Sequence, residues 1–279
     1  MGMRVGTNIT ALKTQHALGM TKRSMETAMN KLSSGSRINK ASDDAVGLAI
    51  SENMKAQIRG LNQANRNAQD AVSMIQISEG GLNEVSNMLI RLRELGIQGA
   101  SDTIGDPERK MVDIEYQQLL EEINRVANST QFNGTKLIAG LGDKIDFQVN
   151  TKNSELTDRI SYDPGEANAS CVGLGINFNT VLTKLDAQES LGTVDQAINQ
   201  LNAMRANLGA MQSRLNSSVE NIFENVQNIS TANSRIRDTD VAAESSEFTK
   251  QNVLMQSGTA ILAQANQQNQ LALSLLNKS

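Results

Sequence analysis

The sequence predicts a mainly α-helical protein: a long antiparallel helical bundle or coiled-coil rod with a small β-hairpin region, plus a two-helix coiled coil formed by the N- and C-termini. Both ends of the 279-residue chain carry an apolar residue every three or four positions, and a short turn-rich stretch lies between them. Aromatic residues make up only 3% of the chain, Trp is absent, and the first aromatic residue is Tyr116. Extended helical packing uses aliphatic and small side chains, so this composition favours rods over a compact globule.

The first 34 residues have a helical but weak apolar pattern, diluted by Thr, Ser, Asn and Lys. Such a segment buries little apolar area, and alone it should be marginal or disordered. The stretch Ser33-Ser34-Gly35-Ser36 then predicts a break.

A longer helix is predicted from residue 43 to about residue 99. Ser42-Asp43-Asp44 supplies side chains that can accept the free N–H groups of its first turn, and two carboxylates suit the positive end of a helix. Gly80-Gly81 in its middle indicates a kink or a close helix–helix approach. Its apolar face comprises Val46, Ile50, Met54, Ile58, Leu61, Ala68, Val72, Ile75, Leu82, Val85, Leu89, Leu92 and Leu95.

A third helix is predicted from Asp106-Pro107-Glu108, with Asp as the cap and Pro at the first helical position, to about residue 128. Phe132-Asn133-Gly134 indicates a turn. Residues 135–180 then alternate with period two around 144–149 and more weakly around 159–162, which predicts one or two small β-hairpins.

Helix is predicted again from about residue 190 to 234, and a last helix from about 241 to 276. The apolar stripe of the first of these is too long for one helix of a compact globule and indicates a rod. If the chain turns back at the hairpins, the long helices form an antiparallel bundle and the terminal arms form a second helical pair. The stripe comprises Leu191, Val194, Ile198, Leu201, Met204, Leu208, Met211, Leu215, Val219, Ile222, Val226, Ile229 and Ile236.

Charge and composition exclude several classes of protein. A net charge of −4 argues against a general nucleic-acid binder, although residues 1–66 hold ten Lys and Arg against four Asp and Glu. That basic arm lacks interleaved aromatics, so an acidic neighbour in an assembly explains it better than nucleic acid does. No apolar run approaches a membrane span, no secretory signal is recognisable at the start, and the single cysteine excludes an internal disulfide framework.

No catalytic, metal or cofactor site is predicted. His16 and Cys171 are the only histidine and cysteine, and they lie in different predicted elements without a local motif. Asp43-Asp44 is better explained as a helix cap than as a metal or acid–base site, and Asp238 with Asp240 as a solvated hinge than as a cation site. The predicted function therefore resides in surfaces. A weakly folding arm that orders against copies of itself is typical of a polymerising subunit rather than an enzyme.

Several motifs resemble those of bacterial flagellin. At the N-terminal end these are LSSGSRIN at 32–39, ASDDA at 41–45 and GLAI at 47–50. Further matches are RLREL at 91–95, TQFNG at 130–134 and LAQAN at 262–266. The similarity covers about residues 1–135 and 190–279, and the motifs occur in order at both ends.

This resemblance implies a domain organisation. An inner-core domain would consist of residues 1–42 and 236–279, and a helical rod domain of residues 43–235 would carry a β-hairpin at about 135–180. About 55 residues separate the rod helices, which leaves no room for outer variable domains and implies a short, core-only flagellin.

The resemblance also implies partners and a location. The subunit would polymerise with itself into the extracellular filament of the flagellum for swimming motility, after type III export through the hollow filament. Expected partners are the flagellar cap protein, the hook-associated junction protein, the flagellin export chaperone, the type III export apparatus and a host flagellin receptor. Nucleic acid, membrane insertion and cofactors are not expected.

Two groups of residues are expected to carry these roles. A host toll-like receptor would recognise the rod through Arg91, Leu95 and Glu122, the positions that match the family, although Ile90 and Gly96 depart from the residues usual there. Subunit packing in the inner core would use Leu12, Leu32, Ile261, Leu262, Leu273, Leu275 and Leu276.

Two alternatives stay open at this point. A hook–filament junction protein shares similar ends but should match less well over 34–39 and 132–134, and it should not form long filaments alone. A non-flagellar coiled-coil scaffold or adhesin should be stably helical as a monomer or dimer, with termini that resist proteolysis.

Overall fold

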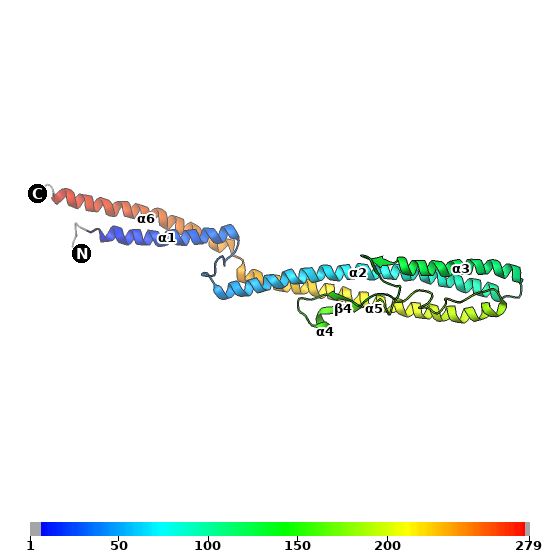
Figure 1. The fold of residues 1–279 in the computed structure, drawn as a ribbon. Helices are drawn as coiled ribbons and strands as arrows, with labels where there is room; N and C mark the ends of the chain where they lie inside the picture. Colours follow the sequence, from blue (N-terminus) through cyan, green and yellow to red (C-terminus); the bar gives the residue numbers. More distant parts are fainter. Residues whose placement is uncertain (1–6, 277–279) are drawn as a thin grey trace. The chain divides into compact units, whose positions relative to one another are not determined.

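Six helices and four short strands follow one another along residues 7–276, the part of the chain that the computed structural model describes; side chains are described for residues 7–268 (Figure 1). The chain divides into two compact units. The terminal unit comprises residues 1–56 and 228–279, and the central unit comprises residues 57–227. The helices are α1 (Ile9–Ser34), α2 (Ala45–Ala100), α3 (Asp106–Ser129), α4 (Glu155–Asp158), α5 (Lys184–Arg237) and α6 (Val241–Leu276).

The central unit is an antiparallel bundle of three helices. Arg93 of α2 pairs with Asp195 of α5 at 2.7 Å, and further back along α2 Glu79 meets Arg205 at 3.9 Å, so α2 and α5 run in opposite directions. The turn from α2 into α3 reverses the chain once more, and α3 lies beside α2 (Figure 1). The predicted helical bundle with small hairpins is confirmed.

Two two-stranded antiparallel hairpins form the β structure of the described chain. Strands β1 (Gln131–Phe132) and β2 (Thr135–Lys136) are joined by Asn133 and Gly134, whose φ angles of 48° and 82° are those of a tight hairpin turn. Strands β3 (Ile145–Gln148) and β4 (Arg159–Tyr162) pair from Ile145 opposite Tyr162 to Gln148 opposite Arg159. The predicted turn at 132–134 is itself the first hairpin, so β structure begins a few residues before the predicted region.

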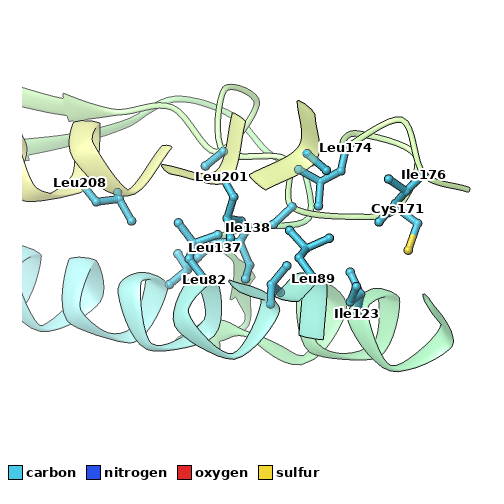
Figure 2. Packing of buried hydrophobic residues seen from close by; sticks show 14 of the residues in the cluster. Leu82, Leu89, Ile123, Leu137, Ile138, Cys171, Leu174, Ile176, Leu201 and Leu208 are labelled. Atoms are coloured by element: carbon cyan, nitrogen blue, oxygen red, sulfur yellow. The ribbon is translucent and has the colours of Figure 1, made fainter. Parts of the chain in front are cut away.

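The core of the central unit is filled partly by the segment that links the helices. Figure 2 shows Leu82 and Leu89 of α2, Ile123 of α3 and Leu201 of α5 facing apolar residues from this segment. Those linking residues are Leu137, Ile138, Cys171, Leu174 and Ile176, and all are at most 3% exposed. The turn-rich middle is therefore packed structure that completes the bundle.

Arg109 joins the end of α2 to the start of α3. Its Nε donates to the Gly99 carbonyl, its Nη2 to the Ser101 carbonyl and its Nη1 to Asp106 Oδ1, each at 2.9 Å. The guanidinium thus supplies donors to carbonyls that the end of α2 leaves free. The prediction that Asp106 caps α3 was wrong by one residue: Gly105 is the cap, and Asp106 lies in the first turn, where it binds Arg109.

Candidate assembly and recognition surfaces

Helices α1 and α6 pack against each other in the terminal unit and run antiparallel. Asn8 Nδ2 donates to the Ala265 carbonyl at 3.0 Å near one end, and Lys31 pairs with Glu244 at 3.3 Å near the other. Between them, a Cβ at Gly258 would lie 2.8 Å from Leu18 Cδ2, so glycine sets the close approach of the two helices. The fully buried residues of this contact, Ala28 and Ala265, are small, and larger residues such as Leu18 are half-buried.

Large apolar side chains of the same pair point outward. Leu12 is 57% exposed and Ile261 is 56% exposed, whereas Leu32 and Leu262 are half-buried. Leu254 and Ile261, seven residues apart and so on one face of α6, line a groove of about 350 Å³ against α1. Further exposed apolar residues of the unit are Ile9, Met20, Met29, Val46, Ile50, Val241 and Val253.

Three of the predicted packing residues, Leu273, Leu275 and Leu276, lie outside the residues whose side chains the structure describes. The four that are described divide into two exposed and two half-buried residues, so the helical pair alone fully buries none of these four.

The segment between α1 and α2 is tied to the residues that join α5 to α6. The Arg37 guanidinium donates to the Ile236 carbonyl through Nη2 at 2.8 Å, and its backbone N–H donates to the Arg237 carbonyl at 2.6 Å. The Arg237 side chain in turn pairs with Glu52. These bonds supply donors to the C-terminus of α5, where the helix leaves its carbonyls free.

The predicted break and caps in these segments are confirmed. Gly35 has a φ of 68°, the left-handed conformation that ends α1. Asp44 Oδ1 accepts from the Gly47 N–H at 2.8 Å and caps α2. Asp43 accepts backbone N–H groups from Lys40 and then Asn39, and these bonds lower the pKa of its carboxyl.

Both residues of the second acidic pair, at 238 and 240, accept hydrogen bonds within the chain. Asp240 Oδ1 accepts from the N–H groups of Ala242 and Ala243, at 2.9 and 3.2 Å, and caps α6. Asp238 accepts a bond from the Ser234 hydroxyl at 2.6 Å.

Of the predicted receptor residues, the structure places two at the surface and one in the core. Arg91 is exposed and pairs with Glu115 of α3 at 2.7 Å and with Glu94 at 2.9 Å, and these carboxylates raise the pKa of its guanidinium. Leu95 is 1% exposed and packs inside the bundle. Glu122 pairs with Arg125 on its own helix, which lowers the pKa of the Glu122 carboxyl.

Sequence reasoning missed Glu115 as the partner of Arg91. Glu122 lies seven residues, about two turns, further along α3 than Glu115, so the structure does not bring it to Arg91. The α2–α3 register that selects Glu115 has no local signal in the sequence. The exposed carboxylates beside Arg91 are therefore those of Glu115 on α3 and Glu94 on its own helix.

The groups with potential chemistry are not arranged as an active site. Cys171 is fully buried, its Sγ lies 3.2 Å from the Leu120 carbonyl oxygen, and burial raises its pKa to about 11, which disfavours the thiolate. His16 is exposed and belongs to the terminal unit, whereas Cys171 belongs to the central unit. Across residues 7–276 we find no cluster of side chains suited to a metal ion, and no helix with the length and apolar character that crossing a membrane requires.

Comparisons with known proteins match the two halves of the chain to one family. Residues 5–143 match the model of the bacterial flagellin N-terminal helical region, and residues 191–276 match that of the C-terminal helical region. The flagellin of Halalkalibacterium halodurans is 42% identical over 274 residues, which cover 98% of this chain and all of that protein. The flagellin of Bacillus subtilis is 41% identical over 306 residues, and a flagellar filament 33 kDa core protein of Treponema phagedenis is 41% identical over 286; each alignment covers 98% of this chain and all of the relative.

Solved structures agree with this assignment. The crystal structure of Bacillus cereus flagellin matches with a TM-score of 0.50 and 28% identity, over 56% of this chain and 88% of that one. A putative flagellar hook-associated protein from Vibrio parahaemolyticus matches with a TM-score of 0.58 over 70% of this chain and all of that one, but at 15% identity it shows the fold alone. Identity above 40% along the full length of two flagellins, together with both family models, shows that the chain belongs to the bacterial flagellin family.

Proposed function

We propose that this chain is the structural subunit of a bacterial flagellar filament and polymerises with copies of itself into the extracellular filament used for swimming. The observation that carries the proposal is the helical pair α1–α6, which fully buries small residues such as Ala28 and Ala265 and leaves large apolar residues such as Leu12 and Ile261 exposed. Exposed apolar area is unfavourable in water at about 25 cal/mol per Å², and packing against neighbouring copies would remove that cost. The relatives are structural proteins, named flagellin or filament core protein, and the chain is not an enzyme.

Within the filament, we propose that residues 1–42 and 236–279 form the inner-core domain and that residues 43–235 form the rod domain, with its β-hairpin region at about 135–180. The terminal helical pair and the three-helix bundle support this division. The subunit-packing residues would be Leu12, Leu32, Ile261 and Leu262 and, beyond the described side chains, Leu273, Leu275 and Leu276.

Further partners belong to the same proposal. They are the flagellar cap protein, the hook-associated junction protein, the flagellin export chaperone and the type III export apparatus. The thin α1–α6 contact supports export, because a chain whose ends gain little from folding alone unfolds readily for passage through a channel.

For a host toll-like receptor, we propose that Arg91 and Glu122 make direct contacts and that Leu95, being buried, acts only by holding α2 in place. In a receptor reporter assay, Arg91→Ala and Glu122→Ala should lower the response without changing the unfolding midpoint. Leu95→Ala should lower both. A Leu95→Ala variant with full stability and no response would show that the residue touches the receptor directly.

The polymerisation proposal is tested with Ile261→Asp. Ile261 is 56% exposed in the subunit, so the substitution should leave monomer helicity unchanged. A carboxylate placed in a buried subunit contact costs several kcal/mol, about a thousandfold or more in the critical concentration for assembly. Electron microscopy should show long filaments from the unmodified chain and none from Ile261→Asp at the same concentration. Normal filaments from the variant would show that this face of α6 is solvated in the polymer.

Limited proteolysis separates the proposal from the coiled-coil scaffold. In dilute monomer, protease should trim the ends to about residues 42 and 236, and the same ends should be protected in filaments. Termini that resist protease in the monomer would favour a scaffold. Failure of the unmodified chain to form long filaments alone would favour a junction protein.

A further inference from the structure

Two grooves flank α5 in the central unit, one on each side of its buried stripe. Leu215 and Ile222 mark that stripe. The groove on one flank, here called the arginine groove, has a volume of about 310 Å³ and is lined by Ser213 and Arg214 of α5 and by residues of α4 and β4. The groove on the other flank, the glutamate groove, has a volume of about 390 Å³ and lies between α5 and α2. An α-helix has 3.6 residues per turn, so the α5 residues that line the two grooves lie on opposite sides of the core stripe, each about 120° from it around the helix axis. The two sets follow one another along consecutive turns of α5.

The arginine groove carries positive charge beside a protruding apolar side chain. Its lining contains Arg159 and Arg214 and no acidic residue. Arg159 is engaged by Asp146 and Gln148, whereas Arg214 is exposed and has no ion pair or hydrogen bond among the described residues. Leu156 on α4 is 95% exposed at its edge. This flank thus offers an apolar knob next to an unpaired cation.

The glutamate groove carries the opposite charge around an exposed ring. Its lining contains Glu220 and Glu224, both exposed, and no basic residue. Phe223 between them is 66% exposed. Asn65 Oδ1 at the α2 side is buried and has no hydrogen-bond donor among the described residues. This flank thus offers an exposed apolar ring with two carboxylates.

We infer that the two grooves are the halves of one lateral contact between neighbouring copies of this chain, with Leu156 and Arg214 of one copy seated against Phe223 and the glutamates of the next. The inference rests on the proposed function, since it needs copies side by side. Opposite charges on different flanks favour a heterologous contact, which repeats from copy to copy and does not close into a dimer. An isologous contact would place like charges together.

Cysteine cross-linking tests the geometry. Because Cys171 is the only cysteine and is buried, thiols placed at Leu156 and Phe223 will dominate oxidation. Filaments grown from an equal mixture of Leu156→Cys and Phe223→Cys chains should give covalent dimers on oxidation, and each variant alone should give none. The double variant should give a ladder of multimers. Phe178→Cys mixed with Phe223→Cys is the matched control, an exposed aromatic of the same unit outside both grooves, and should give no product.

Several outcomes overturn the contact. Dimers from either single variant alone would show an isologous contact. Filaments without cross-links between 156 and 223, or with equal cross-linking in the Phe178→Cys control, would place these residues apart. If the unmodified chain forms no filament, the proposed function fails and the contact fails with it. Filaments without the cross-link refute the contact alone.

Charge reversal tests the pairing without thiols. Arg214→Glu should raise the critical concentration for assembly about tenfold, as should Glu220→Arg or Glu224→Arg, because each sets like charges face to face. Combining Arg214→Glu with one of the glutamate reversals should return the critical concentration to within about twofold of that of the unmodified chain. Additive losses in both combinations would refute the pairing.

Discussion

Gly80 and Gly81 are adjacent on α2, yet substitution by alanine should move stability in opposite directions. A Cβ at Gly80 meets nothing within 4 Å, so Gly80→Ala gains the helix propensity of alanine, about 1 kcal/mol. A Cβ at Gly81 would lie 2.6 Å from Thr130 Oγ1 and 2.9 Å from Ile138 Cδ1. The sequence predicted a kink or a close helix–helix approach here, and the structure shows a close approach made by Thr130 at the end of α3 and by Ile138 just after β2.

The cost at Gly81 follows from how little its neighbours can move. Thr130 Oγ1 donates to the Val126 carbonyl at 2.8 Å, and its Cγ2 would also lie 3.0 Å from the new Cβ, so rotating the side chain exchanges one clash for another. Ile138 is fully buried. Overpacking of this kind costs about 1–3 kcal/mol, which exceeds the propensity gain, so Gly81→Ala should lose about 1 kcal/mol net.

Tyrosine fluorescence provides a matched assay. The chain has two tyrosines and no tryptophan, and both Tyr116 and Tyr162 are buried in the central unit, so their emission reports that unit alone. In urea unfolding of dilute monomer, Gly80→Ala should gain about 1 kcal/mol and Gly81→Ala should lose about 1 kcal/mol. Equal stabilisation by the two substitutions would refute the close approach at Gly81.

Three further outcomes follow from side-chain environments. Arg109→Met should destabilise the central unit by about 2–3 kcal/mol in the same urea assay, because the carbonyls of Gly99 and Ser101 lose a charged donor. An unchanged unfolding midpoint would show that water supplies these carbonyls with donors in place of the guanidinium. Cys171 should not react with a disulfide reagent at pH 8 until the protein is unfolded, since its pKa is raised to about 11 and its side chain is buried. The lowered pKa of Asp43 means that its hydrogen bonds stabilise the folded turn above pH about 4 and are lost as the pH falls through the folded-state value. The protection of the Asn39 and Lys40 amides against exchange, taken relative to the intrinsic rate at each pH, should therefore fall in acid, and Asp43→Asn should abolish that dependence.

The periodic parts of the molecule were predictable because their signals are local. The apolar spacing and caps placed α2 and α6 within two residues of their observed bounds. Helix α5 begins at Lys184, six residues before the predicted start, because Thr183 Oγ1 accepts from the Asp186 N–H and so caps it without a preceding apolar stripe. The period-two pattern located β3 and β4, but the four-residue helix α4 between them had no such signal.

Long-range packing was not predictable, since no local pattern encodes it. The residues that complete the core from the linking segment, such as Leu137 and Ile176, have no periodicity and are set by the shape left between three helices. The pairing of Arg91 with Glu115 depends on the register between α2 and α3. Outward-facing Leu12 carries the same apolar signal as a buried leucine, so its exposure emerged only from the structure.

The large sequence separation of the contacts that close each unit also determines when the chain can fold. Arg93 binds Asp195 across 102 residues, and Asn8 binds Ala265 across 257, so each unit is closed by segments far apart in the sequence. Loop closure must precede these contacts, which makes folding slow compared with helix formation. A chain that emerges gradually, from either end, therefore has no complete core until most of its length is free. We expect a fragment of residues 57–180, which lacks α5, to unfold without a cooperative transition.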